Sequence, residues 1–158
     1  MRRVEQVPNG CAIAVLQMIT EQPFDEIATE LNFRGVGFGE LIVANYLRSK
    51  GYRLETRARW PVGPKVDWPA KPFAPMHYCI VDMNMHWCDQ MLTDTQFRLL
   101  VKNLALAQGI PIPVQHIVAM DDKGAVYDPD PNNRAYTDLS LYKDVLQIIG
   151  VTPPGPPL

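Results

Sequence analysis

Hydrophobic positions follow two different periods along the chain. Up to Gly51 the apolar side chains recur every three or four residues, which predicts helices. The first helix is expected to carry Cys11 in its first turn and to take Asn9 as its N-cap. Further helices are expected over residues 24–31 and 40–50, the last of them ended by Gly51.

Beyond Gly51 apolar and polar residues alternate, which predicts β-strands. The expected strands cover residues 52–60, 76–82, 85–91, 114–120 and 125–128. The turn sequences between them predict two hairpins, one turning at Met83 and Asn84 and the other around residues 121–124. Helices followed by mostly antiparallel strands indicate an α+β fold in which the N-terminal helices pack on the sheet.

Two further elements complete the expected fold. A capping box opens a helix over residues 93 to about 108. A last short element is expected over residues 137–149, ended by Gly150. Residues 1–151 then form a single domain, and the proline-rich residues 152–158 form a tail outside the core.

Composition and charge narrow the class of protein. The chain of 158 residues has a hydrophobic fraction of 47% and a charged fraction of 20%, as an ordinary globular domain does. The formal net charge of -2 gives no basic surface for nucleic acid, and the apolar runs are too short to span a membrane. Three cysteines without a visible signal peptide favour free thiols in a reducing compartment, and therefore a cytoplasmic protein.

The candidate chemistry begins at Cys11, because a helix N-terminus favours the thiolate form of a cysteine. Gln6 lies a short turn upstream, where its side-chain amide can donate to an oxyanion together with the backbone N–H of Cys11. His116 lies near the start of one expected strand, and Asp128 ends the strand paired with it, so that the two side chains can be neighbours. The order Gln, Cys, His, Asp suggests thiol-dependent acyl transfer.

The same residues carry a resemblance to a known family. Gln6, residues 9–16 and residues 24–28 resemble the start of the papain-like bacteriocin-processing peptidases (the double-glycine leader peptidases) and their stand-alone relatives. Residues 116–120 together with residues 127–129 are similar to the His-strand-turn-strand-Asp-Pro segment of that family.

The resemblance implies a papain-like fold and a cysteine peptidase. In such an enzyme Cys11 is the nucleophile, His116 the general base and acid, Asp128 the carboxylate that orients the imidazole, and Gln6 an oxyanion donor. The implied activity is hydrolysis of a peptide or isopeptide bond in a protein or peptide substrate, through an acyl-enzyme and without a cofactor or metal ion. The chain departs from the family at Gly10, where those peptidases have an acidic residue, and its Gln-to-Cys interval is one residue shorter.

A second histidine offers a rival catalytic pair. His77 also begins an expected strand, and Asp89 follows it at the same interval at which Asp128 follows His116. His77 and Asp89 are therefore an alternative pair for Cys11.

Three other interpretations stay open. The expected hairpin over residues 76–91 carries His77, Cys79, His86 and Cys88, a set of side chains that zinc accepts. A disulfide between Cys79 and Cys88 is possible in geometry but is disfavoured in a reducing compartment. The chain is also compatible with a protein-interaction or inhibitor module that keeps a papain-like scaffold without turnover.

Overall fold

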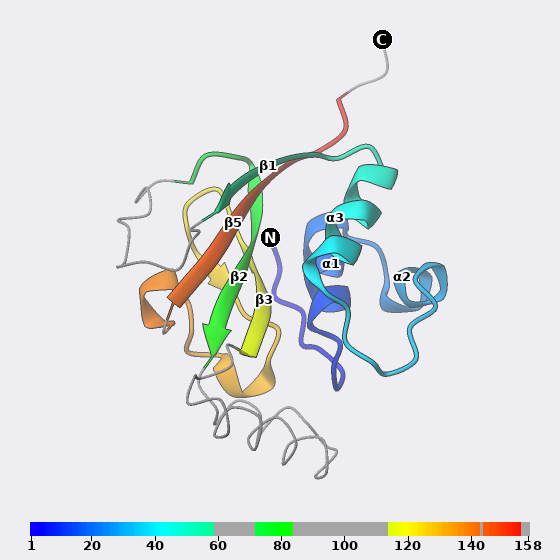
Figure 1. Cartoon of the computed structure of the whole chain (residues 1–158), viewed down its shortest axis with the longest axis horizontal. Helices are drawn as coiled ribbons and strands as arrows, with labels where there is room; N and C mark the ends of the chain where they lie inside the picture. Colours follow the sequence, from blue (N-terminus) through cyan, green and yellow to red (C-terminus); the bar gives the residue numbers. More distant parts are fainter. Residues whose placement is uncertain (59–71, 84–113, 143, 156–158) are drawn as a thin grey trace, which may run out of the picture.

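The computed structural model describes residues 1–58, 72–83, 114–142 and 144–155. In these ranges three helices cover one face of a five-stranded antiparallel sheet, which confirms the α+β class (Figure 1). The helices are α1 (Cys11–Thr20), α2 (Phe24–Glu30) and α3 (Glu40–Ser49). All three lie where the helical period of the sequence predicts them.

The sheet is built from strands that are distant in the sequence. Its members are β1 (Arg53–Ala58), β2 (Met76–Met83), β3 (Val114–Met120), β4 (Val126–Tyr127) and β5 (Asp144–Thr152). Their order is β1-β5-β2-β3-β4, and each pair of neighbours is antiparallel. Between β4 and β5 the chain forms two short 3-10 helices, η1 (Pro131–Asn133) and η2 (Leu139–Leu141). The predicted hairpin of β3 and β4 is confirmed.

Each face of the sheet contributes to its own hydrophobic core. On the helix side the buried sheet residues are Tyr78, Ile80, Ile117, Ala119, Ile149 and Val151. On the opposite side they are Cys79, Val81, Val118, Met120, Val126, Val145 and Ile148. Because side chains alternate between the two faces of a strand, Cys79 faces away from the helices, and α1 carries the other described thiol, Cys11.

The start of α1 differs from the expected cap. Gly10, not Asn9, is the N-cap residue, and it makes no side-chain cap hydrogen bond. Asn9 has a positive φ of 60°, and its side chain instead donates to the carbonyl oxygen of Gly35 at 2.9 Å. The Gly10 N–H closes a turn on the carbonyl of Val7 at 2.9 Å, and a Cβ at Gly10 would lie 2.8 Å from Val7 Cγ2. The sharp turn therefore requires glycine directly before Cys11.

The last element also differs from the expectation. β5 lies between β1 and β2 and runs through Gly150, which pairs with Glu55 on one side and His77 on the other. A Cβ at Gly150 would lie 2.5 Å from Phe73 Cε2. Gly150 therefore permits a close approach inside a strand and does not end an element. Thr152, which was expected to open the tail, is the last residue of β5.

Several expected elements lie outside the described residues. These are the strand over 85–91 with its turn, the helix over 93–108 and the last two positions of the first expected strand. Within the described ranges, β2 pairs with β3 and β5. No helix in these ranges has the length and apolar character to cross a membrane.

Candidate active site

The N-terminal end of α1 presents a thiol and free backbone donors. Cys11 is the first residue of the helix and is partly exposed. The first backbone hydrogen bond of the helix runs from the Ala14 N–H to the Gly10 carbonyl at 3.0 Å, so the Cys11 N–H has no acceptor within the helix. This end of the helix dipole favours a negative charge, whether on the sulfur or on a bound oxyanion.

The structure brings His116 and Asp128 to this thiol. His116 lies in β3 and is fully buried, and its Nε2 atom lies 2.7 Å from Oδ1 of Asp128, which follows β4. The side chain of Cys11 lies close enough to His116 to contribute, through its charge and hydrogen bonding, to the raised pKa of that ring. Because Nε2 is bound to Asp128, Nδ1 is the ring nitrogen left for the thiol. Three of the four predicted site residues thus converge from α1, β3 and the loop after β4.

The carboxylate of Asp128 is held by residues that the sequence does not single out. The Tyr142 hydroxyl donates to Oδ2 at 2.6 Å, and the Asn133 side-chain amide donates to the same oxygen at 3.2 Å. The backbone N–H of Asp130 donates to Oδ1 at 2.9 Å. With His116, four donors therefore surround a carboxylate that is 1% exposed. The Asp-Pro-Asp turn is the sequence signal for the hydrogen bond from the Asp130 N–H. Tyr142 has no such signal, because only the tertiary fold brings it to Asp128.

The electrostatics of the pair favour an imidazolium next to a carboxylate. Burial acts to lower the pKa of His116, but the hydrogen bonds to Asp128 and Cys11 and their charges outweigh it and raise this pKa to about 10. Burial likewise acts to raise the pKa of Asp128, yet the hydrogen bond and positive charge of His116 hold it below its usual value. His116 is therefore a cation at neutral pH, positioned where a cation stabilises a thiolate.

The backbone of Gln6 is hydrogen-bonded to the loop that carries Asp128. Its backbone N–H donates to the carbonyl of Pro129 at 2.8 Å, and the residue is 9% exposed. The turn that follows leads directly into Cys11. The backbone of Gln6 is thus held against the Asp128 loop, five residues before the first residue of α1.

The rival histidine has a different environment. His77 is paired with Met120, four residues along β3 from His116, which is a separation of about 13 Å. Its Nε2 atom accepts hydrogen bonds from the backbone N–H groups of Phe73 and Ala74, each at 3.2 Å. This nitrogen is therefore occupied by the backbone. Asp89, its expected partner, lies outside the described residues.

The zinc interpretation involves residues beyond the described ranges, because His86 and Cys88 fall there. Cys79 is fully buried, and burial raises the pKa of its thiol to about 12. Among the described side chains, no group of three or more His, Cys, Asp or Glu residues is arranged to hold a metal ion.

Comparison with known proteins adds no relative. No protein-family model, curated protein or solved structure matches the chain.

Proposed function

We propose that the protein is a thiol hydrolase with a papain-like catalytic arrangement that cleaves a peptide or isopeptide bond. The observation that carries this proposal is the contact chain from Cys11 through His116 to Asp128. A thiol at a helix N-terminus, an imidazolium and an orienting carboxylate are the groups that nucleophilic acyl transfer needs. Their order along the chain and their contacts agree with the roles implied by the family resemblance.

The first half of the reaction forms a thioester. The Cys11 thiolate attacks the substrate carbonyl carbon, and the carbonyl electron pair moves to oxygen, where the Cys11 N–H and the Gln6 side-chain amide donate to it. The tetrahedral intermediate then collapses. The C–N bond breaks as His116 gives its proton to the leaving amine. Asp128 holds the ring in position throughout.

The second half hydrolyses the thioester and regenerates the free enzyme. Neutral His116 takes a proton from water as the water oxygen attacks the thioester carbonyl carbon. Collapse of this second intermediate breaks the C–S bond, releases the carboxylic acid and regenerates the thiolate beside protonated His116. No cofactor enters this sequence, because the protons and electron pairs balance among substrate, water and these side chains.

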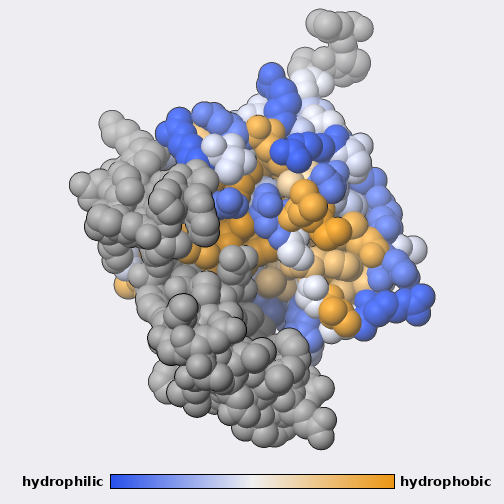
Figure 2. Space-filling model, in the orientation of Figure 1, coloured by the Kyte–Doolittle hydropathy of each residue, from blue (hydrophilic) through white to orange (hydrophobic). Residues whose placement is uncertain are grey.

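A protein or peptide substrate is supported by the surface around the thiol. The Asn9 side chain holds Gly35, which places the loop between α2 and α3 beside the turn before Cys11. Val7, Val36 and Leu41 leave hydrophobic side chains exposed in this part of the chain. Figure 2 shows hydrophobic residues at the surface on the side of the molecule where the helices lie. Apolar side chains of an extended peptide can bind to such a surface.

One observation favours a second function. The side chain of His116 is 0% exposed. A substrate must therefore gain access to a buried imidazole before His116 can protonate its leaving group. A protein-interaction module without turnover would keep the buried Cys-His-Asp contacts for the stability of the fold alone.

An activated ester separates the two functions. With 4-nitrophenyl acetate as the probe, the hydrolase is expected to form an acetyl-thioester on Cys11, detected by peptide mass mapping, and to release nitrophenolate over many turnovers. Cys11→Ala should lose both signals, whereas the matched variant Cys79→Ala should keep them because that thiol is 0% exposed and the probe does not reach it. A wild-type chain that reacts no faster than its Cys11→Ala variant contradicts the hydrolase and supports the interaction module.

A further inference from the structure

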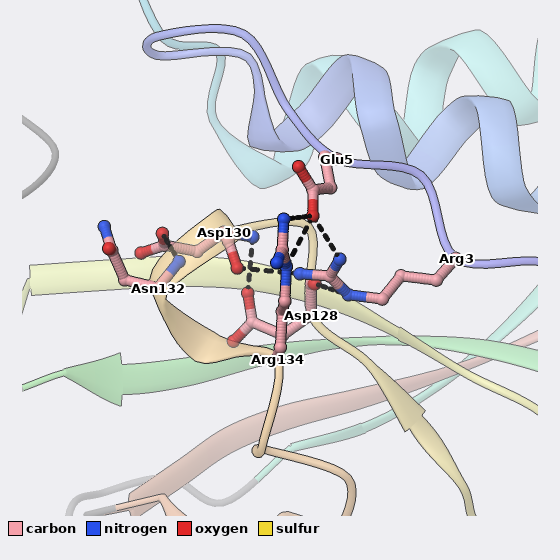
Figure 3. Close-up of polar contacts among 6 residues, drawn as sticks. All are labelled: Arg3, Glu5, Asp128, Asp130, Asn132 and Arg134. Atoms are coloured by element: carbon pink, nitrogen blue, oxygen red, sulfur yellow. Dashed lines mark hydrogen bonds and ion pairs between the residues drawn. The ribbon is translucent and has the colours of Figure 1, made fainter.

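The segment that carries Gln6 is hydrogen-bonded to three successive carbonyl groups of the Asp128 loop, and Figure 3 shows the two that bind Arg3. Arg3 Nε donates to the carbonyl oxygen of Asp128 at 2.9 Å, and Arg3 Nη2 donates to that of Asp130 at 2.8 Å. The carbonyl between them, that of Pro129, accepts from the Gln6 N–H at 2.8 Å. One short stretch of chain thus contacts three consecutive carbonyls, those of residues 128–130, beside the triad carboxylate.

The contacts of Arg3 use the geometry of a guanidinium and not only its charge. Nε and Nη2 point to two different carbonyls, while Nη1 donates to Oε1 of Glu5 at 2.9 Å. A planar group with donors in fixed directions can span three acceptors at once. A lysine ammonium carries the same charge but cannot reproduce this planar arrangement of donors.

Glu5 adds a second tie to the same loop region. Its Oε1 atom accepts from Arg134 Nε at 2.7 Å as well as from Arg3. These two hydrogen bonds lower the pKa of Glu5, which is therefore ionised at neutral pH. Because the side chains of Glu5 and Arg134 are 40% and 69% exposed, this ion pair is worth little compared with the Arg3 contacts.

We infer that Arg3 is a positioning residue of the active site, which aligns the oxyanion donor Gln6 and the thiol of Cys11 with the Asp128–His116 pair. This inference rests on the proposed thiol hydrolase. The segment with Gln6 and Cys11 and the pair of His116 and Asp128 come from opposite ends of the sequence. Arg3 joins the two, because it precedes Gln6 in the chain and its side chain binds the backbone of the Asp128 loop. Without it the N-terminal segment keeps one described backbone bond, from Gln6, to that loop.

The expected consequence is a loss of alignment more than a loss of fold. Arg3 is only partly buried, so its removal exposes the two carbonyls to water, which can satisfy them. A shift of about 1 Å between reacting groups can cost about a hundredfold in rate. Arg3→Gln is therefore expected to lower the reactivity of Cys11 near neutral pH by between about tenfold and a hundredfold.

The test measures alkylation of Cys11 by iodoacetamide across a range of pH in the full chain. Arg3→Gln and Arg3→Lys should both react more slowly at neutral pH, with a profile displaced toward alkaline pH, because the imidazolium is no longer held at the thiol. Arg2→Gln is the matched control, since Arg2 is an exposed neighbour, and it should behave as the wild type does. A merely structural role of Arg3 would lower the melting temperature without displacing the pH profile.

Two other results would contradict the inference or the proposed function on which it rests. If wild-type Cys11 is fast and Arg3→Lys is equally fast, the charge and not the guanidinium geometry suffices and the inference is wrong. If wild-type Cys11 reacts as slowly as Cys79, the proposed function itself fails.

Should Arg3→Gln fail to fold, a chemical rescue replaces it: Arg3→Ala is assayed in the presence of millimolar ethylguanidinium. Recovery of the Cys11 rate by this additive, with no recovery in Arg2→Ala, supports the positioning role, and absence of recovery in a folded Arg3→Ala contradicts it.

Discussion

Two histidines on neighbouring strands are both fully buried, but only one of them lies in the proposed active site. His116 on β3 meets a thiol and a carboxylate, whereas His77 on β2 meets the backbone N–H groups of Phe73 and Ala74. The sequence makes each histidine a candidate partner for Cys11, because an aspartate follows both at the same interval. Only the tertiary fold distinguishes the two.

The pKa shifts of the two histidines have opposite signs. Burial lowers the pKa of His77 and outweighs the hydrogen bonds to the backbone of Asp121 and Met120. The pKa of His116 is raised, because charged partners overcome the same burial. Burial alone therefore does not distinguish the two histidines. Their ionisable partners do, and the following variants test whether this difference makes His116 the histidine of the proposed active site.

The largest effect is expected at the two thiols. Cys11→Ala should abolish acylation by 4-nitrophenyl acetate with little change in stability, because this side chain is partly exposed. Cys79→Ala should leave acylation intact and lower the free energy of unfolding by about 1 kcal/mol, because it removes a buried sulfur. Urea unfolding and the acylation rate are measured on both. The reverse assignment of the two effects would show that Cys11 only fills the core.

Replacing the histidines should separate reactivity from stability. His116→Ala is expected to reduce Cys11 alkylation to the rate of an ordinary thiol, because the cation beside it is removed. His77→Ala should leave the alkylation rate of Cys11 nearly unchanged. It should lower the free energy of unfolding by about 2 kcal/mol, because two partly buried N–H groups lose their acceptor. Loss of Cys11 reactivity in His77→Ala alone would transfer the general base to His77.

Asp128→Asn should reduce turnover by about a hundredfold to ten thousandfold, because the amide no longer stabilises the imidazolium. The comparison variant is Asp89→Asn, which removes the carboxylate of the rival pair and is expected to keep full turnover. Steady-state hydrolysis of 4-nitrophenyl acetate by both variants is the measurement. Full turnover in Asp128→Asn combined with inactivity in Asp89→Asn would assign the carboxylate to the other pair.

The opposite pKa shifts predict opposite dependences of stability on pH. Because the pKa of His116 is raised to about 10, its stabilising contribution is complete below the unfolded pKa of about 6.5 and is lost as the pH rises through 10. The pKa of His77 is lowered, so its contribution is complete above about 6.5 and is lost as the pH falls below that value. Melting temperatures of His116→Gln and His77→Gln should therefore approach the wild-type value at alkaline and at acid pH, respectively. Parallel curves for both variants would contradict the assigned charge states.

The smallest effect is expected at the tyrosines behind the carboxylate. Tyr142→Phe removes the 2.6 Å hydrogen bond to Asp128 and should slow Cys11 alkylation severalfold, with a loss of at least about 1.5 kcal/mol of stability. Tyr136, whose ring packs edge-on against Tyr142 at 5.1 Å between centroids, provides the matched variant. Tyr136→Phe should leave the alkylation rate at the wild-type value. Equal rates in the two variants would mean that the Tyr142 hydroxyl does not position Asp128.

Local patterns in the sequence predict most of the described elements and the contact between His116 and Asp128. The helices have a clear apolar period, and the hairpin of β3 and β4 brings its own histidine and aspartate together. Both signals are local, since each depends on residues within one element or one turn. For this reason they can be recognised without knowledge of the rest of the fold.

The features that the sequence does not predict depend on distant contacts. The pairing of β5 between β1 and β2 is such a feature, because Gly150 resembles a terminator until Phe73 is seen to pack on it. Asn9 resembles an N-cap until Gly35 is seen to accept its side chain. Arg3 carries no motif at all, and its role follows from a loop more than a hundred residues away.

The most direct test of the central claim is the rate of iodoacetamide alkylation of each cysteine in one wild-type sample, followed across pH by peptide mass mapping. The Cys11–His116–Asp128 arrangement predicts that Cys11 reacts near neutral pH far faster than Cys79, and that Asp128→Asn displaces its profile toward alkaline pH. Slow and equal alkylation of Cys11 and Cys79 at neutral pH, unchanged in Asp128→Asn, would contradict the catalytic assignment.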